Sequence, residues 1–481
     1  MTSSSAAPAL VWLRNDLRLA DNPALEAARA SGRPLILLYV LEVADEIRPL
    51  GGAARWWLGR SLAGLSHDIA ALGGTLVLRS GDARRVLPDI AAETGAGAIY
   101  WNRRYGAAEI ATDTALKLTL REKGLETASF NAALLHEPWT VRTQKNEPYK
   151  VFTPFFRAAH TMHVRAPARL GSGWTWARAP NSERLVDWRL EPRAPDWAGG
   201  LRDAWIPGEA GARAALEQFL AQRLSGYASR RDRPDIEGTS RLSPYLRFGN
   251  ISPHQILGAV RHREARGDAR GADIAKFVSE IYWREFSYHL LFHNPNLADQ
   301  NFNPRFDRFE WRNDDAVERA WQKGRTGFPI IDAGMRQLWQ TGWMHNRVRM
   351  ITASFLIKHG LTDWRRGEAW FWDTLVDADP ASNAASWQWV AGSGADAAPY
   401  FRIFNPVLQG EKFDPDGAYV RHFVPEIAKL PANVIHKPWR ATADVLHRAD
   451  VVLGETYPNP VLDLDTSRRR ALEHLDRLRD E

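Results

Sequence analysis

Five short apolar runs in the first 130 residues, separated by stretches with helical spacing, restrict the fold more than any other feature of this chain. The runs are Ala9–Leu13, Leu35–Leu41, Thr75–Leu78, Ala98–Trp101 and Glu126–Phe130. They hardly alternate between apolar and polar residues, as expected for strands that are buried on both faces of a parallel sheet. The sequence therefore predicts an α/β domain over residues 8–131, built on a doubly wound, Rossmann-like parallel sheet.

The pattern changes twice after this predicted sheet. Residues 132–207 are interrupted by prolines and are rich in arginine and tryptophan, and the tryptophans are too many for a flexible linker. From residue 208 onward, helical periodicity dominates and no strand pattern recurs. We therefore expect an ordered connector over 132–207, followed by a larger all-helical domain over 208–481.

The composition excludes several kinds of chemistry. The 481 residues include 21 Trp but no Cys, which rules out disulfides, Cys-ligated zinc, iron–sulfur clusters and thiol catalysis. The 63 Lys and Arg residues exceed the 57 Asp and Glu residues, which gives a formal net charge of +6. A small positive charge indicates a local basic face, and such a face suits a polyanionic partner.

The N-terminal sequence does not read as a signal peptide or a membrane anchor. Arg14, Asp16, Arg18 and Asp21 interrupt any apolar core there. The apolar run over 35–41 is too short to cross a bilayer. We therefore expect a soluble, cytoplasmic protein without a membrane partner, and we expect it to act as a monomer.

Motifs of the common nucleotide-binding and metal-binding classes are missing. The chain has no P-loop, and Arg14–Asp16 follows the first predicted strand where a dinucleotide fingerprint would place glycines. A relaxed glycine motif at Gly392 and Gly394 lies in helical territory and reads as a turn. His289 and His293 are spaced for zinc, but no third ligand is evident, so we expect no metal site.

Two segments of the helical half combine residues that suit a charged, flat ligand. Tyr227 precedes the hydroxyl-rich stretch at 239–243, where backbone amides at a helix start can bind phosphate, although helix capping alone explains that stretch equally well. Glu280, Trp283 and Arg284 share one face of a predicted helix. A stacked heteroaromatic ligand and a plain salt-bridged face remain alternatives for this helix.

Two further segments carry amides, carboxylates and indoles. Asn346 and Met350 lie one helical turn apart, and an amide beside a thioether suits a pocket for bases. Asp377 and Asp379 precede a polar stretch that contains Asn383 and two tryptophans, Trp387 and Trp389. Routine core packing does not explain so polar a loop.

At these residues the chain resembles the photolyase/cryptochrome family. The matching blocks run in order through the chain and include the opening Val-Trp-Leu-Arg-Asn-Asp-Leu-Arg-Leu-Ala-Asp-Asn at 11–22. The others are Thr-Ser-Arg-Leu-Ser-Pro-Tyr-Leu at 239–246, Ile-Tyr-Trp-Arg-Glu-Phe at 281–286, Trp-Met-His-Asn-Arg at 343–347, Trp-Gln-Trp at 387–389 and Ala-Pro-Tyr-Phe-Arg-Ile-Phe-Asn-Pro at 398–406. The resemblance implies an N-terminal antenna domain joined by a long connector to a helical domain that holds FAD.

The resemblance also implies which residues hold the cofactor. Thr239 and its neighbours bind the FAD phosphates and ribose, Arg349 pairs with Asp377 beside the isoalloxazine, and Asn383 contacts the reactive ring nitrogen. The implied FAD-binding residues are Tyr227, Thr239, Ser240, Arg241, Leu242, Ser243, Arg349, Asp377, Asp379 and Asn383.

The substrate implied by the resemblance is a pyrimidine dimer flipped out of DNA. Light excites reduced anionic FAD, an electron passes to the dimer, the cyclobutane ring splits and the electron returns. The implied catalytic residues are Glu280, Asn346, Arg347 and Asn383. The implied DNA and dimer contacts are Arg231, Glu280, Trp283, Asn346, Arg347, Met350, Trp389 and Gln409, with Trp283, Trp389 and Met350 as apolar walls. A protonated Glu280 carboxyl would stabilise the developing anion.

Three tryptophans occupy the positions of the family's electron-transfer chain. Trp387, Trp364 and Trp311 are expected to relay electrons from the surface to photoexcited oxidised flavin. Trp370 and Trp372 lie nearby in sequence, and the sequence leaves open whether they form a second path.

At several positions this chain differs from other branches of the photolyase/cryptochrome family, and these differences indicate which substrate class the resemblance implies. Asn346 and Met350 stand where six-four photolyases carry histidines, which favours cyclobutane dimers. Asn383 stands where plant cryptochromes usually have Asp, and Asn383-Ala384-Ala385 resembles the bacterial class III branch. The chain ends at Glu481 without a signalling tail, which also favours repair. A blue-light signalling flavoprotein without repair activity is the alternative, and a light-independent DNA-binding module is a further one.

The antenna is read from a single residue. Glu109 matches a glutamate that holds 5,10-methenyltetrahydrofolate in folate-type members, whereas Ala108 replaces an expected Asn. A deazaflavin antenna, or none, is therefore the other reading.

Overall fold

A computed structural model describes residues 6–397 and 402–480 of the chain, so residues 398–401 of the last matching block lie outside the described residues. The first part is a sheet of five parallel strands in the order β3-β2-β1-β4-β5. The strands are β1 (Ala9–Leu13), β2 (Leu35–Glu42), β3 (Leu76–Gly81), β4 (Ala98–Asn102) and β5 (Glu126–Phe130). The doubly wound α/β class is confirmed.

Helices cover both faces of this sheet, and this burial explains its apolar strands. One face packs against α1 (Pro23–Ala30) and α2 (Gly52–Ala71), which meet Val11 and Leu37. The other face packs against α3 (Ala83–Thr94) and α4 (Ala107–Glu122), which meet Leu10, Trp12 and Leu38. β3 runs past its predicted end because Arg79–Gly81 continues to pair with β2.

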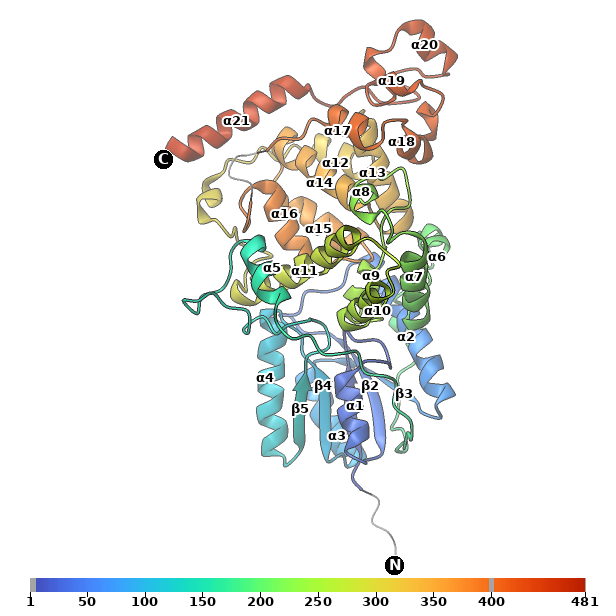
Figure 1. Ribbon diagram of the computed structural model, residues 1–481, viewed down its shortest axis with the longest axis vertical. Helices are drawn as coiled ribbons and strands as arrows, with labels where there is room; N and C mark the ends of the chain where they lie inside the picture. Colours follow the sequence, from blue (N-terminus) through green and yellow to red (C-terminus); the bar gives the residue numbers. More distant parts are fainter. Residues whose placement is uncertain (1–5, 398–401, 481) are drawn as a thin grey trace, which may run out of the picture.

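The larger part of the molecule is helical, and it stacks above the sheet in Figure 1. The connector carries α5 (Phe152–His160), η1 (Leu185–Trp188) and α6 (Gly199–Ala204). The first helices after it are α7 (Glu209–Gln222), α8 (Tyr227–Arg230), α9 (Ser243–Arg247), α10 (Pro253–Ala265), α11 (Gly271–His293), η2 (Pro304–Arg308) and α12 (Asp315–Gln322). The following ones are α13 (Pro329–Thr341), α14 (Asn346–Ser354), the π-helical η3 (Phe355–His359), α15 (Trp364–Thr374) and α16 (Ser382–Ala391).

The C-terminal helices complete this part. They are α17 (Pro406–Phe413), α18 (Ala418–Phe423), η4 (Pro425–Ile427), α19 (Ala432–Ile435), η5 (Pro438–Arg440), α20 (Ala443–Arg448) and α21 (Leu464–Asp480). In Figure 1, α18–α20 project at the end of the molecule opposite the sheet. Within the residues that the structure describes, no helix is both long enough and apolar enough to span a membrane.

The connector is ordered because its tryptophans are anchored. The Trp176 indole donates to the Leu72 carbonyl at 2.7 Å, and its backbone bridges to Leu35 at the start of β2. The Trp205 indole donates to the Thr341 carbonyl at 2.7 Å in the helical part. The connector therefore touches both of the parts that it joins.

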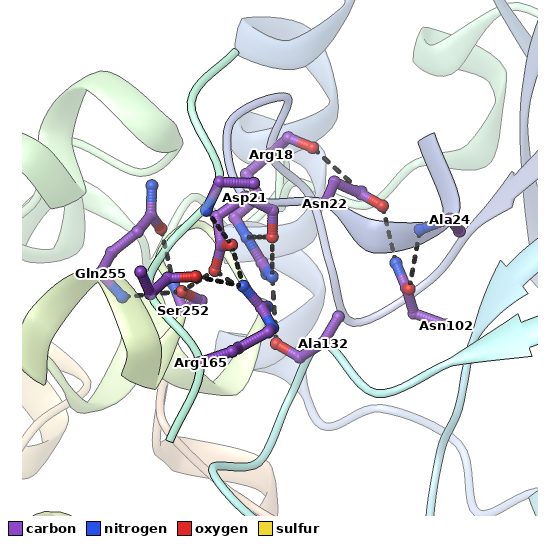
Figure 2. Close-up of polar contacts among 11 residues, drawn as sticks. Arg18, Asp21, Asn22, Ala24, Asn102, Ala132, Arg165, Ser252 and Gln255 are labelled. Carbon is purple, nitrogen blue, oxygen red and sulfur yellow. Dashed lines mark hydrogen bonds and ion pairs between the residues drawn. The ribbon is translucent and has the colours of Figure 1, made fainter. Parts of the chain in front are cut away.

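A buried polar network joins the α/β domain, the connector and the helical domain (Figure 2). The Arg18 guanidinium donates to the carbonyls of Asp21, Ala132 and Gly249. The Asp21 carboxylate accepts from Arg165 of the connector and from the Ser252 hydroxyl of the helical domain. Gly249 has a φ of +64°, and a Cβ there would lie 2.1 Å from the Asn15 carbonyl oxygen, so only glycine permits this close approach.

Candidate functional site

One cavity of about 800 Å³, including its open mouth, lies in the helical domain. Helices α8, α9, α10, α11 and α14 contribute its walls together with the turn before α16. The lining residues are Tyr227, Ser240, Leu242, Ser243, Leu246, Arg247, Ile256, Phe277, Glu280, Ile281, Arg284, Arg349, Asp377, Asp379 and Ser382. The structure thus brings together residues that the sequence places more than 150 positions apart.

Most of the predicted cofactor residues line this cavity. Tyr227, Ser240, Leu242 and Ser243 form one end, where the Ser240 hydroxyl accepts from the Leu242 amide at 3.4 Å. The Tyr227 ring is buried edge-on against Phe277. This end offers the hydroxyl groups of Ser240 and Ser243 together with nearby backbone amides.

Three predicted cofactor residues are not among the lining residues. Thr239 and Arg241 are next to the lining residue Ser240 in the sequence, and Asn383 follows the lining residue Ser382. The Arg241 guanidinium lies over the rings of Trp205 at 4.3 Å and Trp343 at 5.2 Å, and its backbone has a φ of +53°.

Another part of the cavity lining, which we call the acidic end, carries two carboxylates that are held in place. Asp379 Oδ1 accepts from the amides of Ala381 and Ser382 at the start of α16, and Oδ2 accepts from the Tyr288 hydroxyl at 2.7 Å. Asp377 Oδ2 pairs with Arg349 at 2.8 Å, whereas its Oδ1 is buried without a hydrogen-bond partner among the described residues. This end can therefore accept a hydrogen bond from a ligand.

Asn383 is held by a contact that crosses between the domains. Its amide Nδ2 donates to Glu368 Oε1 at 2.8 Å, and Glu368 pairs with Arg48 of the α/β domain, also at 2.8 Å. Sequence reasoning missed Arg48 and Glu368, because no local pattern connects residues so far apart.

A chain of ion pairs joins α11, the residues just after α8, and α14, and it meets the cavity at Glu280; we call it the charged strip. It consists of Lys276, Glu280, Arg231, Asp232 and Arg347. Glu280 pairs with Lys276 at 2.7 Å and with Arg231 at 2.8 Å. Asp232 bridges Arg231 at 3.1 Å and Arg347 at 2.8 Å.

The strip includes two residues that sequence reasoning missed. Lys276 lies four residues before Glu280 on α11, so the usual helix spacing for an ion pair could have predicted it. Asp232 gave no such signal, because its partner Arg347 lies on another helix. A carboxyl hydrogen bond from Glu280 to a substrate requires at least one of its two ion pairs to open.

The buried His345 imidazole lies below the charged strip. Its Nδ1 accepts from the Arg347 amide at 3.2 Å and caps α14. Burial lowers the pKa of His345 to about 4, although the nearby Asp232 carboxylate opposes the shift. The imidazole is therefore neutral at neutral pH.

The predicted apolar walls are partly exposed. One face of the Trp283 indole stacks on Phe152 of the connector at 3.7 Å, a contact that the sequence did not indicate. The Trp389 indole donates to the Asp396 carbonyl at 3.1 Å. Asn346 is exposed at the start of α14, while Met350 and Gln409 are half-buried.

The three predicted relay tryptophans differ in burial. Trp387 and Trp364 are buried, whereas Trp311 is only half-buried and packs against Phe309 at 4.4 Å. Trp387 also contacts Trp321 at 6.2 Å, a buried indole that sequence reasoning did not single out. The predicted relay thus runs from two buried indoles to one that is partly exposed.

Trp370 and Trp372, for which the sequence left a second electron-transfer path undecided, have different surroundings. Trp370 stacks on Trp339 at 6.2 Å, and Trp339 is 59% exposed. The Trp372 indole instead donates to the Pro49 carbonyl under Arg48.

The predicted antenna residue, Glu109, lies close to an arginine of the α/β domain. Glu109 is half-buried in the first turn of α4, and together with Glu42 it holds the pKa of Arg104 above its usual value although burial opposes this.

The two histidines that are spaced for zinc, His289 and His293, both contact the Pro138 carbonyl. Over residues 6–397 and 402–480, no group of three His, Cys, Asp or Glu side chains is arranged to hold a metal ion. Gly392 ends α16 at a φ of +92°, the glycine turn that the sequence predicted.

Comparison with known proteins identifies the family. The family model described as DNA photolyase matches residues 9–170, and the one described as the FAD binding domain of DNA photolyase matches residues 277–477. The chain is 54% identical over 479 residues to the deoxyribodipyrimidine photo-lyase of Agrobacterium fabrum, with 98% of each chain covered. The chain belongs to the DNA photolyase family.

Solved structures within the photolyase family agree with the whole fold. A bacterial class III photolyase from Agrobacterium tumefaciens matches with a TM-score of 0.96 and 53% identity over 100% of both chains. A Synechocystis cryptochrome matches with a TM-score of 0.87 and 28% identity over 97% of this chain and 99% of that one. The family membership implies FAD as the cofactor of the helical domain.

Proposed function

We propose that this protein repairs cyclobutane pyrimidine dimers in DNA by light-driven electron transfer, as a deoxyribodipyrimidine photo-lyase. The observation that carries the proposal is the 54% identity to a photo-lyase over 98% of the chain, together with a cavity bordered by the charged strip. Repair needs a flavin site open to a flipped-out pyrimidine dimer, and this cavity has an open mouth beside paired, exchangeable charges.

The lining of the cavity fits FAD in its chemistry. Hydroxyls and amides at Ser240 and Ser243 suit phosphates, and the free Asp377 Oδ1 suits an N–H group of the isoalloxazine. When bound, FAD in its reduced anionic form would supply the light absorption and the electron, and Arg349, Asp377 and Asp379 would fix its orientation.

The charged strip suits the damaged DNA. Arg231 and Arg347 would exchange Asp232 for DNA phosphates, and Glu280 and Asn346 would hydrogen-bond to the dimer. Trp283, Trp389 and Met350 would form apolar walls, and Gln409 of α17 would contact the strand. Asn383 would hold the flavin ring through its amide, whose nitrogen Glu368 already orients.

The indoles of Trp387, Trp364 and Trp311 would carry electrons from the surface toward the cavity. Trp387→Phe should abolish photoreduction of the oxidised protein and preserve repair by chemically reduced protein. Trp321→Phe is the matched control, since Trp321 touches Trp387 but is not part of the proposed relay. Photoreduction that survives in Trp387→Phe would refute the relay assignment.

Finer features belong to the same proposal. Glu109 would hold 5,10-methenyltetrahydrofolate as the antenna, and the absorbance spectrum of the purified protein distinguishes this from a deazaflavin or from flavin alone. We propose that the protein acts in the cytoplasm, which fractionation of cells tests, and as a monomer on DNA, which gel filtration with and without a DNA duplex tests.

A blue-light signalling role is the alternative, because the chain is also 36% identical to Arabidopsis thaliana cryptochrome-2 over 98% of its length. The deciding experiment incubates reduced protein with an oligonucleotide that carries one thymine dimer, in light and in darkness. Restored thymines in the illuminated sample alone support repair. Dimers that persist under light, in a protein that still binds and photoreduces FAD, support signalling.

A further inference from the structure

Arg247 is a buried cation that nothing in the predicted site accounts for. It is the last residue of α9, is 6% exposed and lines the cavity. Its Nε donates to the Ala378 carbonyl at 2.6 Å, while its Nη1 is buried without a hydrogen-bond partner. Among the residues that the structure describes, no carboxylate lies within ion-pair distance of its guanidinium.

The other two arginines of the cavity are compensated. Arg349 pairs with Asp377 at 2.8 Å, and Arg284 lies 3.6 Å from Glu285 and donates to the Ala133 carbonyl. A buried charge without a counter-charge is costly unless a ligand supplies one. Arg247 therefore indicates an anionic group of the ligand on its side of the cavity.

The position of Arg247 indicates whether this anionic group is the diphosphate or the isoalloxazine ring. Ser243 and Arg247 share one face of α9, and both line the cavity about 6 Å apart along the helix. Ser243 belongs to the hydroxyl-rich end that suits the diphosphate. Arg247 is anchored instead on Ala378, between the two carboxylates of the acidic end, where the isoalloxazine is expected.

We propose that Arg247 is a further cofactor-binding residue, one that stabilises the negative charge of the reduced flavin ring. The proposal rests on the proposed function only for the identity of the cofactor as FAD. It gives the cavity a preference for the reduced anionic form, which is the form that the repair reaction uses. Positive charge near the flavin ring is a known means by which a protein tunes this cofactor.

The test compares how the protein binds oxidised and reduced FAD when the charge is removed. Arg247→Gln should weaken binding of reduced FAD about 10- to 100-fold more than binding of oxidised FAD. Since a tenfold change corresponds to 29.6 mV for a two-electron couple, the midpoint potential should fall by about 30–60 mV. Arg247→Lys, which keeps the charge, should restore most of the difference. The matched control is Arg336→Gln, which removes another partly buried arginine, paired with Glu426 outside the cavity.

Two results would overturn the proposal. Equal losses of affinity for oxidised and reduced FAD would show that Arg247 anchors the diphosphate, and an unchanged potential with unchanged affinity would show a structural role only. If neither variant folds, the pH dependence of the wild-type potential decides. One proton per two electrons, or about 30 mV per pH unit, between pH 5 and 6, where reduced flavin in water is neutral, supports a stabilised anion, and two protons contradict it.

Failure of this inference and failure of the proposed function look different. A protein that repairs dimers but shows an Arg247-independent potential refutes the role of Arg247 and leaves repair standing. A protein whose potential depends on Arg247 but which leaves dimers intact under light refutes repair and leaves the role of Arg247 standing.

Discussion

The two charged regions of the site are built in opposite ways. At the acidic end of the cavity, the Asp377 side chain is 2% exposed and keeps one oxygen without a partner, and Arg247 keeps a free Nη1. In the charged strip, the partners are 12–38% exposed and every carboxylate faces two cations. The first region is incomplete without a ligand, whereas the second compensates itself.

This difference suits a resident cofactor on one side and a passing substrate on the other. Unsatisfied buried groups are costly, so the acidic end gains most from a ligand that stays bound. Exposed ion pairs contribute little to stability, so the strip can exchange its partners at small cost. The predictions that follow test whether the two regions can be disturbed separately.

The largest effect is expected from Asp377→Ala at the acidic end. Arg349 would lose its counter-charge, and FAD affinity should fall by about 2–4 kcal/mol, or roughly 30- to 900-fold. Titration of the apoprotein with FAD, followed by flavin fluorescence, measures this loss. The exposed ion pair of Asp315 with Arg366 supplies the control, because Asp315→Ala should leave FAD affinity unchanged. A similar affinity in both variants would contradict the assignment of this end to the cofactor.

The buried His345 should make the free energy of unfolding depend on pH. Because the pKa of His345 is lowered to about 4 in the folded protein, the unfolded chain takes up its proton near pH 6.5 and the folded chain does not. Stability should therefore fall as the pH drops from 6.5 toward 4, by about 2 kcal/mol at pH 5 from this group.

His345→Asn isolates that contribution. Asparagine also caps a helix, so α14 should keep its start and stability at pH 7 should hardly change. Urea unfolding at pH 7 and pH 5 should show a smaller loss in the variant than in the wild type. An identical loss in both proteins would mean that His345 does not titrate as its burial predicts.

A smaller effect is expected from Glu280→Ala in the strip. Splitting of the dimer should slow about tenfold, since one charge-assisted hydrogen bond contributes roughly 1.5 kcal/mol. FAD should remain bound, because Arg231 and Lys276 are its partners and neither belongs to the acidic end. Single-turnover repair under a light flash measures the rate, with the exposed Glu264→Ala as control. Loss of flavin in Glu280→Ala would show that the charged strip also holds the cofactor, and it would contradict the separation of the two regions.

The same contrast explains what the sequence could predict. The strands were predictable because burial on both faces leaves apolar runs, and β1 and β5 match their predicted bounds. The cavity residues Arg349 and Asp377 lie outside the matching blocks and were assigned by resemblance, and the structure pairs them. Their roles toward FAD and DNA stay predictions.

The residues that escaped prediction depend on contacts between distant segments. Phe152 under Trp283 and Arg48 behind Glu368 come from the connector and the α/β domain. Arg247 ends a five-residue helix, and its sequence context says nothing about a missing counter-charge. Burial without a partner is a property of the folded state, so only the structure reveals it.

The smallest and most selective effect is expected from Arg347→Ala at the far end of the strip. A guanidinium that releases Asp232 to bind a phosphate displaces about one counterion, so the salt dependence of DNA binding should lose about one unit of slope. Affinity for dimer-containing DNA should fall only a few-fold at low salt, and FAD affinity should not change. Binding isotherms at several salt concentrations measure the slope, with Arg448→Ala on α20 as a control that removes an equal charge from an exposed pair. An unchanged slope in Arg347→Ala would place the DNA elsewhere, whereas a changed slope beside an intact flavin site would show that the two charged regions act independently.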